Sequence, residues 1–592
     1  MRLSHSRPAS RQSLLNTLLF LPLAGLKRPW DLRCYTGPHL ALLTGRSKAY
    51  GYHHTERFLG QLAKTDTSLT LTKAVANWTT RLWQPSQPEY EYEQATAPGP
   101  LTFYVDGHHK PVYSKRLLPR GLVGRLGKIL PSRALVLLHD AWGHPLVATT
   151  GRGDTHLTLG LVGTLTLYEE ATELNRVARI VIDREGMAST FLAGLVGQQR
   201  NVITLLRTDQ YKDLSSFKEV SEFVPLSYNR KGQIIREVAS AQFELKVAKS
   251  SPLPLKVALI RDLRNSLVTV PPSTSPSTTE VEDGPGRLIP VVTTALSSPI
   301  DPVTLAQTYI SRWPRQENII KDWLLPLGLD TNHGFSKTEV ENSETSRRRQ
   351  KMEQQLGHCH RYEQMARQRY EQATKHHHQM HQKAYSYSRE LSKKEEEYYY
   401  KLEMEQAYTD QAAKEATEND KYLVRSRTRL ERYRERKWAA RERANEESRK
   451  AEQYRTKIKQ LETELDRLDH KERQMAELDD RKDQLMTMLK VALANLGMWV
   501  RDNCFGASYA EASWQRLLPF FRLGGWVSSD GQKVAIELEK FNHRGMNRDL
   551  AELCEKVNNL QLKVEDGRRL EFSLRQESIT LVSDARTFEK VA

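Results

Sequence analysis

The chain is poor in the features that mark secreted and membrane proteins. Only four of its 592 residues are cysteines, and no two of them have the spacing of a zinc-binding CxxC pair. The sequence therefore indicates neither a disulfide framework nor a zinc site, and it favours a reducing compartment. The apolar run at residues 14–25 contains Pro22 and is too short to span a membrane, so we expect a buried helix there rather than an export signal.

Two other site signatures are incomplete. Gly151 and Gly153 lack the remaining glycines of a dinucleotide-binding or phosphate-binding loop, which argues against nucleotide binding. Only helix residues three or four positions apart share a face, so His377 or His378 could join His381 in a two-ligand metal site at best. A solvated helix face is the simpler interpretation of these histidines.

Positive charge is what the chain has in excess. The formal net charge is +16, and charged residues make up 27% of the sequence against 39% hydrophobic residues. A basic balance of this size favours a polyanionic partner, because phosphate groups are the usual counterpart of clustered Lys and Arg. The low hydrophobic fraction indicates a long solvated segment beside the globular parts.

Two aspartates follow short apolar runs. Residues 101–105 and 178–182 have strand-like sequences, and they lead directly into Asp106 and Asp183. Neighbouring strands of one sheet can bring such residues together, so their separation in the sequence does not prevent a shared site. The alternation of strands and helices between residues 101 and 207 predicts an α/β layer.

A third acidic residue lies on a predicted helix at residues 309–321. Glu317 is surrounded there by basic and apolar residues, and it shares a helix face with Lys321, four positions later. Pro302 favours a helix start shortly before this stretch. Pro314 lacks an N–H group and predicts a kink or a restart of the helix.

Together these three pieces resemble the DDE transposases of bacterial insertion sequences, over roughly residues 30–340. In that family the first Asp closes the first strand of a ribonuclease-H-like domain, the second closes the fourth strand, and the Glu lies on a helix after an insertion. Tyr309, Arg312, Glu317 and Lys321 resemble the family's Tyr-Arg-Glu-Lys signature. The spacing differs from one common form: four residues rather than three separate Arg312 from Glu317, and Lys321 follows the Glu three positions early.

The resemblance implies a DNA transposase that cleaves double-stranded DNA at element ends and joins those ends to a target. Asp106, Asp183 and Glu317 would be the catalytic residues and would hold two Mg²⁺ (or Mn²⁺) ions, with Asp106 bridging both; such hard cations prefer carboxylate oxygens. The residues that would contact DNA phosphate are Tyr309, Arg312 and Lys321. The resemblance further implies a homodimer in the DNA complex, no membrane partner, and a cytoplasmic, nucleoid-associated bacterial protein.

The fold class expected is an α/β ribonuclease-H-like core with a β-rich insertion, a helical N-terminal domain, a long helical arm and a small α+β C-terminal region. The predicted segments are 1–100 (helical, possibly DNA-binding), 101–207 (first part of the core), 208–286 (β-rich insertion), 287–340 (second part of the core with the Glu helix), 341–489 (helical or coiled-coil) and 490–592 (α+β).

The predicted arm has no proline between residues 340 and 490, which indicates long helices. A hairpin or a dimer arm fits a heptad seam approximated by Ile458, Leu461, Leu465, Leu468, Met475 and Leu478. The His376–His378 and Tyr398–Tyr400 stretches fit no seam, and we expect that part to be poorly packed.

Two alternative functions remain open from the sequence. The first is a ribonuclease-H-like nuclease that cleaves DNA without strand transfer. The second is an inactive coiled-coil DNA-binding scaffold. A metal-dependent cleavage assay separates the scaffold from the two enzymes, and joining of a DNA end to a second DNA separates the transposase from the nuclease.

Overall fold

The structure is a computed structural model, and it describes residues 8–36, 40–41, 44, 46, 48–64, 66–83, 102–172, 177–247, 251–264, 287–296, 300–404, 420–469, 474–564 and 567–575. The chain forms two compact units: a main unit of residues 1–338 and 476–592, and a helical unit of residues 339–475. The predicted linker at 85–100, the loop at 271–285 and most of the helix predicted at 37–44 lie outside the described residues.

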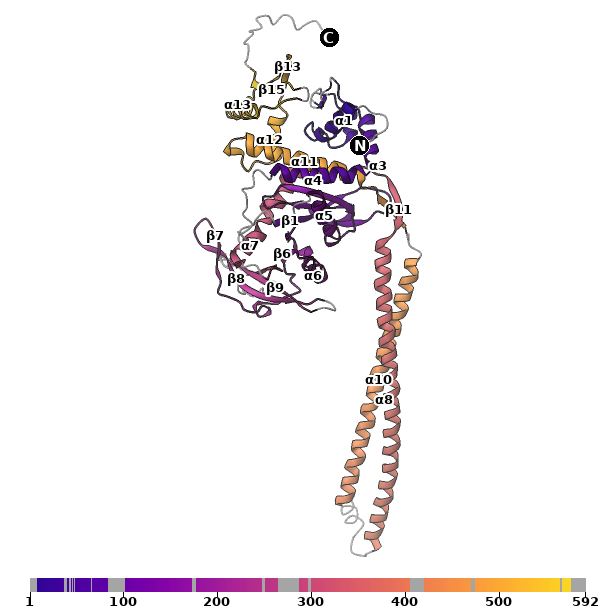
Figure 1. The fold of residues 1–592 in the computed structure, drawn as a ribbon. Coiled ribbons are helices and arrows are strands. Elements are labelled where there is room, and N and C mark those ends of the chain that lie inside the picture. Colours follow the sequence, from indigo (N-terminus) through magenta and orange to yellow (C-terminus); the bar gives the residue numbers. More distant parts are fainter. Residues whose placement is uncertain are drawn as a thin grey trace, which may run out of the picture. The chain divides into compact units, whose positions relative to one another are not determined.

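A large mixed sheet is the centre of the main unit (Figure 1). Its strand order is β2-β3-β1-β5-β6-β10-β9-β8-β7, and β4 also pairs with β3. Strand β1 runs antiparallel to β3 and parallel to β5, and β6 is parallel to β5. The strands are β1 (Thr102–Pro111), β2 (Arg120–Val123), β3 (Lys128–His139), β4 (Pro145–Arg152), β5 (Arg179–Ile182), β6 (Asn201–Leu205), β7 (Val224–Tyr228), β8 (Ile234–Leu245), β9 (Leu253–Asp262) and β10 (Arg287–Thr293).

The predicted β-rich insertion, residues 208–286, contains β7, β8 and β9, and these strands extend the same sheet. Strand β10 pairs antiparallel with β6, and β9, β8 and β7 follow it in order. The alternation of buried side chains lets these strands share the apolar layer of the core, since Val238, Ala258 and Val291 pack in one cluster with Tyr104 and Val181.

Helices cover both faces of the sheet. Helices α4 (Thr67–Trp83), α5 (Leu157–Thr172) and α11 (Arg481–Cys504) pack together over β3 and β4, while α7 (Pro302–Ile310) packs on β8, β9 and β10. Short helix α6 (Ser189–Gly197) lies beside β6. As predicted, residues 14–25 include a buried helix, α1 (Pro8–Phe20), in which Leu14 and Leu18 are buried. Within the described residues, the helices are all too short or too polar to cross a bilayer.

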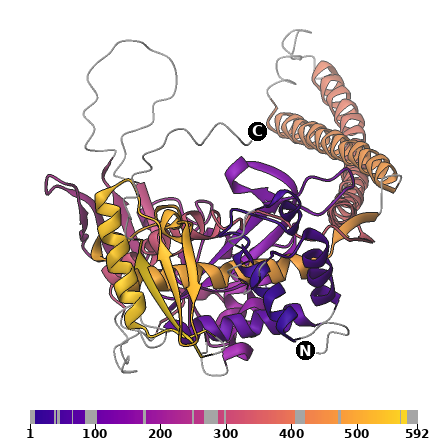
Figure 2. The same cartoon turned by 90° about the horizontal axis from the view of Figure 1, so that it is seen from above.

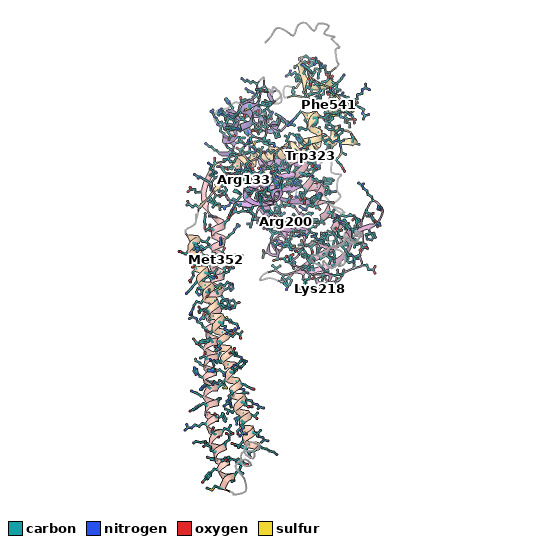
Figure 3. All side chains as sticks on the ribbon, turned by 180° about the vertical axis from the view of Figure 1, so that it is seen from behind. Arg133, Arg200, Lys218, Trp323, Met352 and Phe541 are labelled. Carbon is teal, nitrogen blue, oxygen red and sulfur yellow. The ribbon has the colours of Figure 1, made fainter. Side chains whose placement is uncertain are left out.

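The predicted division at residues 489 and 490 falls inside α11, which belongs wholly to the main unit. Trp83 at the end of α4 donates a hydrogen bond to Asn495 of α11 over 2.7 Å. Lys110, Arg133 and Asp483 form a buried ionic group that ties β1 and β3 to the same helix. These contacts between residues far apart in the sequence hold α11 on the sheet; Figure 3 labels Arg133.

After α11 the chain forms a small α+β layer, as predicted. Helix α12 (Trp514–Phe521) follows α11 in the chain. The N-terminal helix α3 (Tyr52–Lys64) also packs against α11. The strands β13 (Gly525–Ser529), β14 (Lys533–Leu538) and β15 (Arg569–Leu574) form a three-stranded sheet. Helix α13 (Arg544–Asn559) packs along that sheet, drawn in yellow in Figure 2.

The helical unit is an antiparallel pair of long helices, α8 (Ser343–Met404) and α10 (Lys421–Asp469). The fold-back form of the predicted arm is therefore observed. Its seam includes Ile458, Leu461, Leu465 and Leu468, packed against Met352 and Cys359 of α8. Met352 is labelled in Figure 3.

Two details of the predicted arm are wrong. Met475 and Leu478 leave the seam, because α10 ends at Asp469 and residues 474–478 form β12 (Gln474–Leu478), which pairs with β11 (Lys337–Glu341). The tyrosine-rich part is packed: Tyr387 stacks on Tyr433 with 5.1 Å between ring centroids, and Tyr398 lies against the cluster around Leu391 and Leu423. Stacked aromatic rings supply here the apolar surface that a leucine heptad would supply.

Candidate active site

Strand alternation places both aspartates on the same face of the sheet. Phe103 and Val105 point into the core beneath α5, whereas Tyr104 packs on the opposite face beneath α7. Asp106 lies on the same face of the sheet as Tyr104, because side chains two positions apart in a strand share a face. Asp183 likewise lies on the face of Val181, which packs with Tyr104.

The register of β1 and β5 brings the two aspartates side by side. Val105 of β1 is paired with Ile182 of β5 in the parallel ladder, and in both segments the next residue is an aspartate. Contrary to prediction, Asp106 does not close its strand, since β1 continues to Pro111 by pairing with β3. The parallel pairing with β5 ends just before Asp106, and the strands separate there.

Glu317 reaches the aspartates through a widened helical turn. Asp301 caps α7 by accepting a hydrogen bond from Thr304 N over 2.9 Å, and Pro302 occupies the first turn, as predicted. The predicted break near Pro314 is a π-helical turn, η7 (Trp313–Glu317), in which Asn318 N–H donates to Trp313 O five residues earlier. Widened turns of this kind occur frequently at functional sites.

The π turn accounts for the unusual spacing of Arg312 and Glu317. Residues five apart on a regular α-helix point about 140° away from each other. The wider turn brings the two side chains together, and Arg312 Nη2 donates a short hydrogen bond to Glu317 Oε1. The π-helical turn thus accommodates the additional residue between Arg312 and Glu317.

One guanidinium lies among all three acidic side chains. Arg312 Nη1 is 3.9 Å from Asp106 Oδ1, and Arg312 Nη2 is 4.0 Å from Asp183 Oδ1 in addition to its bond with Glu317. The Arg312 side chain is 11% exposed, against 22% for Asp106, 27% for Glu317 and 43% for Asp183. The carboxylates are therefore open to solvent around a buried cation, and we call these four residues the carboxylate cluster.

The pKa values reflect this concentration of negative charge. Burial raises the pKa of Asp106 to about 6; Arg312 opposes this shift, and Glu317 and Asp183 reinforce it. Burial also raises the pKa of Glu317. Burial disfavours the charged form of Arg312, but Tyr309 and the three carboxylates together raise its pKa. The cluster therefore needs a cation to hold its acids ionised.

The predicted phosphate-contacting residues occupy different positions. Tyr309 lies at the edge of the cluster, where its hydroxyl donates to Asp183 Oδ1 over 3.5 Å, and burial raises its pKa to about 12. Arg312 lies at the centre of the cluster. Lys321 is exposed on the following turn, in a second π-helical stretch, η8 (Ile320–Leu324). The structure thus brings Tyr309 and Arg312, but not Lys321, to the acids.

Three further acidic residues stay out of the cluster. Asp140 accepts hydrogen bonds from the backbone of Trp142 and His144, which makes it a turn residue, as expected. Asp154 is paired with Arg152, and Glu185 is exposed beside Asp183.

A hairpin turn fixes the π-helical segment, a feature that sequence analysis missed. Arg315 Nη1 donates a short hydrogen bond to Ala141 O in the β3–β4 turn. Gly143 in the same turn has φ +98°, and a Cβ there would come within 2.4 Å of Arg315 O. Only glycine permits this approach of two backbones.

Gln316 is a second missed feature. Its side chain is fully buried, and both of its amide atoms lack a hydrogen-bond partner within the described residues. A buried unpaired amide costs free energy. Gln316 precedes Glu317 directly, so the π-helical segment that carries Glu317 is destabilised by this unpaired amide.

The C-terminal region supports the same segment from behind. Trp323, labelled in Figure 3, is 2% exposed and packs edge-on against Trp514 of α12. Gly497 of α11 lies against both indole rings, where a Cβ would be within 3 Å of each. Helices α11 and α12 of the C-terminal region therefore support the segment that carries Glu317, a role that the sequence left undecided.

The donor set of the carboxylate cluster suits hard divalent cations, because Mg²⁺ and Mn²⁺ prefer carboxylate oxygens. Three acids also converge here on a single positive group. Within the described residues, however, no three His, Cys, Asp or Glu side chains stand close enough to hold a metal ion, and the Arg312 guanidinium lies among the three acids.

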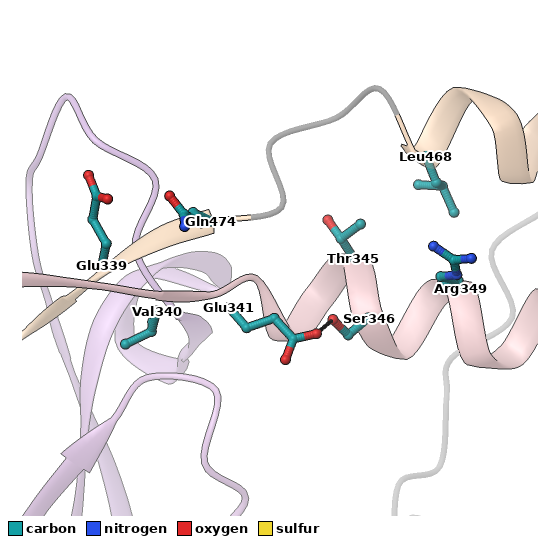
Figure 4. A pocket seen from close by; sticks show the side chains of 8 residues that line it. All are labelled: Glu339, Val340, Glu341, Thr345, Ser346, Arg349, Leu468 and Gln474. Carbon is teal, nitrogen blue, oxygen red and sulfur yellow. Dashed lines mark hydrogen bonds between the residues drawn. The ribbon is translucent and has the colours of Figure 1, made fainter.

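A separate pocket of about 430 Å³ lies within the helical unit (Figure 4). Its lining combines acidic and basic groups, including Glu339, Glu341 and Arg349, and Glu341 accepts a hydrogen bond from Ser346 inside it. The mixed charges compensate each other and indicate no particular ligand.

The sequence was compared with models of protein families and with curated proteins. No family model and no curated protein matches it.

Proposed function

We propose that the protein is a DNA transposase with a ribonuclease-H-like core, which cleaves phosphodiester bonds at element ends and transfers the ends to a target. The observation that carries this proposal is the convergence of Asp106, Asp183 and Glu317 on Arg312 from three separate elements. The aspartates come from β1 and the end of β5, and the glutamate comes from a helix reached after β7–β10. This is the order in which the resembled family presents its acids.

The order of the strands along the chain supports the same core. If the short strand β2 is left out of the count, β5 is the fourth strand, and Asp183 follows its last residue, as in the resembled family. The four strands that follow β6 in the chain lengthen one edge of the sheet before the Glu helix. The formal charge of +16 supports a polyanionic substrate.

Asp106, Asp183 and Glu317 would hold two Mg²⁺ or Mn²⁺ ions, which supply a polarised nucleophile and stabilise the leaving oxygen. The chain's own contribution is to hold three acids together in a small volume beside Arg312. Arg312 neutralises them in the metal-free protein, and the π turn and the Gly143 contact fix where Glu317 stands. Lys321, which is exposed on the turn after Glu317, would contact DNA phosphate.

The test uses a plasmid that carries the gene with its native flanking DNA. Replacing Asp106, Asp183 or Glu317 with Ala should abolish Mg²⁺-dependent cleavage at the element ends and leave DNA binding within about twofold. Glu185→Gln is the matched control, because it removes an exposed carboxylate two residues from Asp183 and should retain cleavage.

The products decide among the alternatives. Cleavage followed by joining of the ends to a second DNA supports the transposase. Cleavage without joining would indicate a nuclease instead. A folded wild-type protein that binds DNA without cleaving it would indicate a scaffold and overturn the proposal.

A further inference from the structure

The middle of the helical pair carries a concentration of positive charge from both helices. Residues 421–443 of α10 include ten Lys and Arg against three Glu. Residues 365–383 of α8 include four Lys and Arg and four His against one Glu. The pairs Tyr387–Tyr433 and Tyr362–Tyr454 stack across the two helices. Residues 365–383 therefore lie opposite the part of α10 between Tyr433 and Tyr454, which includes Arg436 and Arg443.

The arginines of α10 form a continuous stripe along one flank of the seam, which we call the arginine stripe. Its members follow one another at intervals of four, three, four and seven residues, the repeat that keeps side chains on one helix face. All of them are exposed, while the seam residues Leu423 and Leu430 beside them are buried. The arginine stripe consists of Arg425, Arg429, Arg432, Arg436 and Arg443.

This stripe lacks the internal compensation found elsewhere on the helical pair. Arg348 pairs with Glu464, and Lys450 pairs with Glu446 and Glu447. Within the described residues, by contrast, Arg432, Arg436 and Arg443 have no acidic partner within ion-pair distance.

Across the seam from the Arg436–Arg443 end of the stripe lie histidines of α8, whereas near the other end Arg427 pairs with Glu395 of α8. The His377 ring lies 5.8 Å from that of His378 and 6.4 Å from that of His381. Burial, then His378 and Lys437 of α10, lower the pKa of His377. The charged groups of α10 that act on the His377 ring, Lys437 and Arg441, are thus both cationic, and the histidines bring no acid that would compensate the exposed arginines at this end of the stripe.

We propose that the arginine stripe binds the phosphate backbone of duplex DNA, as a contact surface separate from the carboxylate cluster. The stripe runs from Arg425 to Arg443, eighteen residue steps or about 27 Å along the helix. Duplex DNA presents about one negative charge per 1.7 Å of axis, so this length faces several phosphates. The planar guanidinium binds phosphate oxygens through two parallel hydrogen bonds, which suits a surface made of Arg rather than Lys.

The experiment compares two triple variants of the full-length protein. Arg432→Gln/Arg436→Gln/Arg443→Gln removes three charges from the stripe. Lys457→Gln/Lys459→Gln/Arg467→Gln removes three exposed charges from the same helix where acidic residues surround them. Gln is a good helix former, so both variants should keep the wild-type helix content by circular dichroism.

Affinity for a short mixed-sequence duplex is measured over a range of salt concentrations. The stripe variant should bind at least about tenfold more weakly, with a salt slope smaller by about 2 to 3, because each lost phosphate contact removes about 0.9 from the slope. The control variant should stay within about threefold of wild type.

Unchanged affinity and salt slope in a folded stripe variant would overturn the proposal. So would equal competition by polyglutamate at matched charge, which would point to an acidic protein as the partner. Asp183→Asn should leave this binding intact, so failure of the catalytic assignment and failure of the stripe assignment are distinguishable.

Discussion

Arg312 and Glu317 are joined by a hydrogen-bonded ion pair across a π-helical turn, and the same guanidinium faces Asp106 and Asp183. A cation of the chain itself thus occupies the centre of the acidic group. This arrangement is the starting point of the predictions below.

Replacing Arg312 with Gln should destabilise the metal-free protein by on the order of 2 kcal/mol, because it leaves three partly exposed carboxylates without their counter-ion. Mg²⁺ or Mn²⁺ should then raise the melting temperature of Arg312→Gln more than that of wild type, since a ligand stabilises the form that binds it. Thermal unfolding with and without metal measures both effects. Equal metal-induced shifts in the two proteins would show that Arg312 and the metal do not share the cluster.

Asp106 should make stability fall as pH rises from about 4 to about 6. The folded carboxyl keeps its proton up to pH about 6, whereas the pKa of the unfolded one is the ordinary aspartate value of 3.8, so the folded state binds more protons in this window. The difference corresponds to roughly 3 kcal/mol. Asp106→Asn, which stays neutral, should lack this fall and be the more stable protein at neutral pH. Chemical denaturation at several pH values tests this, and parallel curves for wild type and variant would contradict it.

Gln316→Leu should stabilise the protein by about 1 kcal/mol, because it removes a buried amide without hydrogen bonds and keeps the volume. Gln484→Leu is the matched comparison: Gln484 accepts from Thr150 N and donates to Ala148 O, so its loss should destabilise by at least about 1 kcal/mol. Urea unfolding distinguishes the two. If Gln316→Leu destabilises as much as Gln484→Leu, the Gln316 amide has a partner after all.

The buried ionic group on α11 should dominate the stability of the main unit. Asp483→Ala leaves Lys110 and Arg133 buried without their shared carboxylate and should cost about 3–5 kcal/mol. Glu446→Ala, which breaks an exposed pair with Lys450, should leave the unfolding midpoint nearly unchanged. Similar midpoints for the two variants in urea would refute the assignment.

The sequence was sufficient for features set by local pattern. The short apolar runs at residues 101–105 and 178–182 predicted two strands that lead into Asp106 and Asp183, and the absence of proline predicted the long helices. It could not predict the π turn, because the width of that turn depends on the contact between Arg315 and the Gly143 turn, residues far apart in the chain. The pairing of β10 with β6 and the packing of Trp323 against Trp514 are long-range in the same way.

The central claim is that Asp183 and its two acidic neighbours hold the metal ions for DNA cleavage. Asp183→Cys tests it most directly, since a thiolate is a poor ligand for Mg²⁺ and binds more thiophilic ions such as Mn²⁺ better. We predict that Asp183→Cys fails to cleave the element-end plasmid with Mg²⁺ and regains cleavage with Mn²⁺, while Asp183→Ala stays inactive with both. Wild-type cleavage rates for Asp183→Cys and Asp183→Ala in Mg²⁺ would contradict the account.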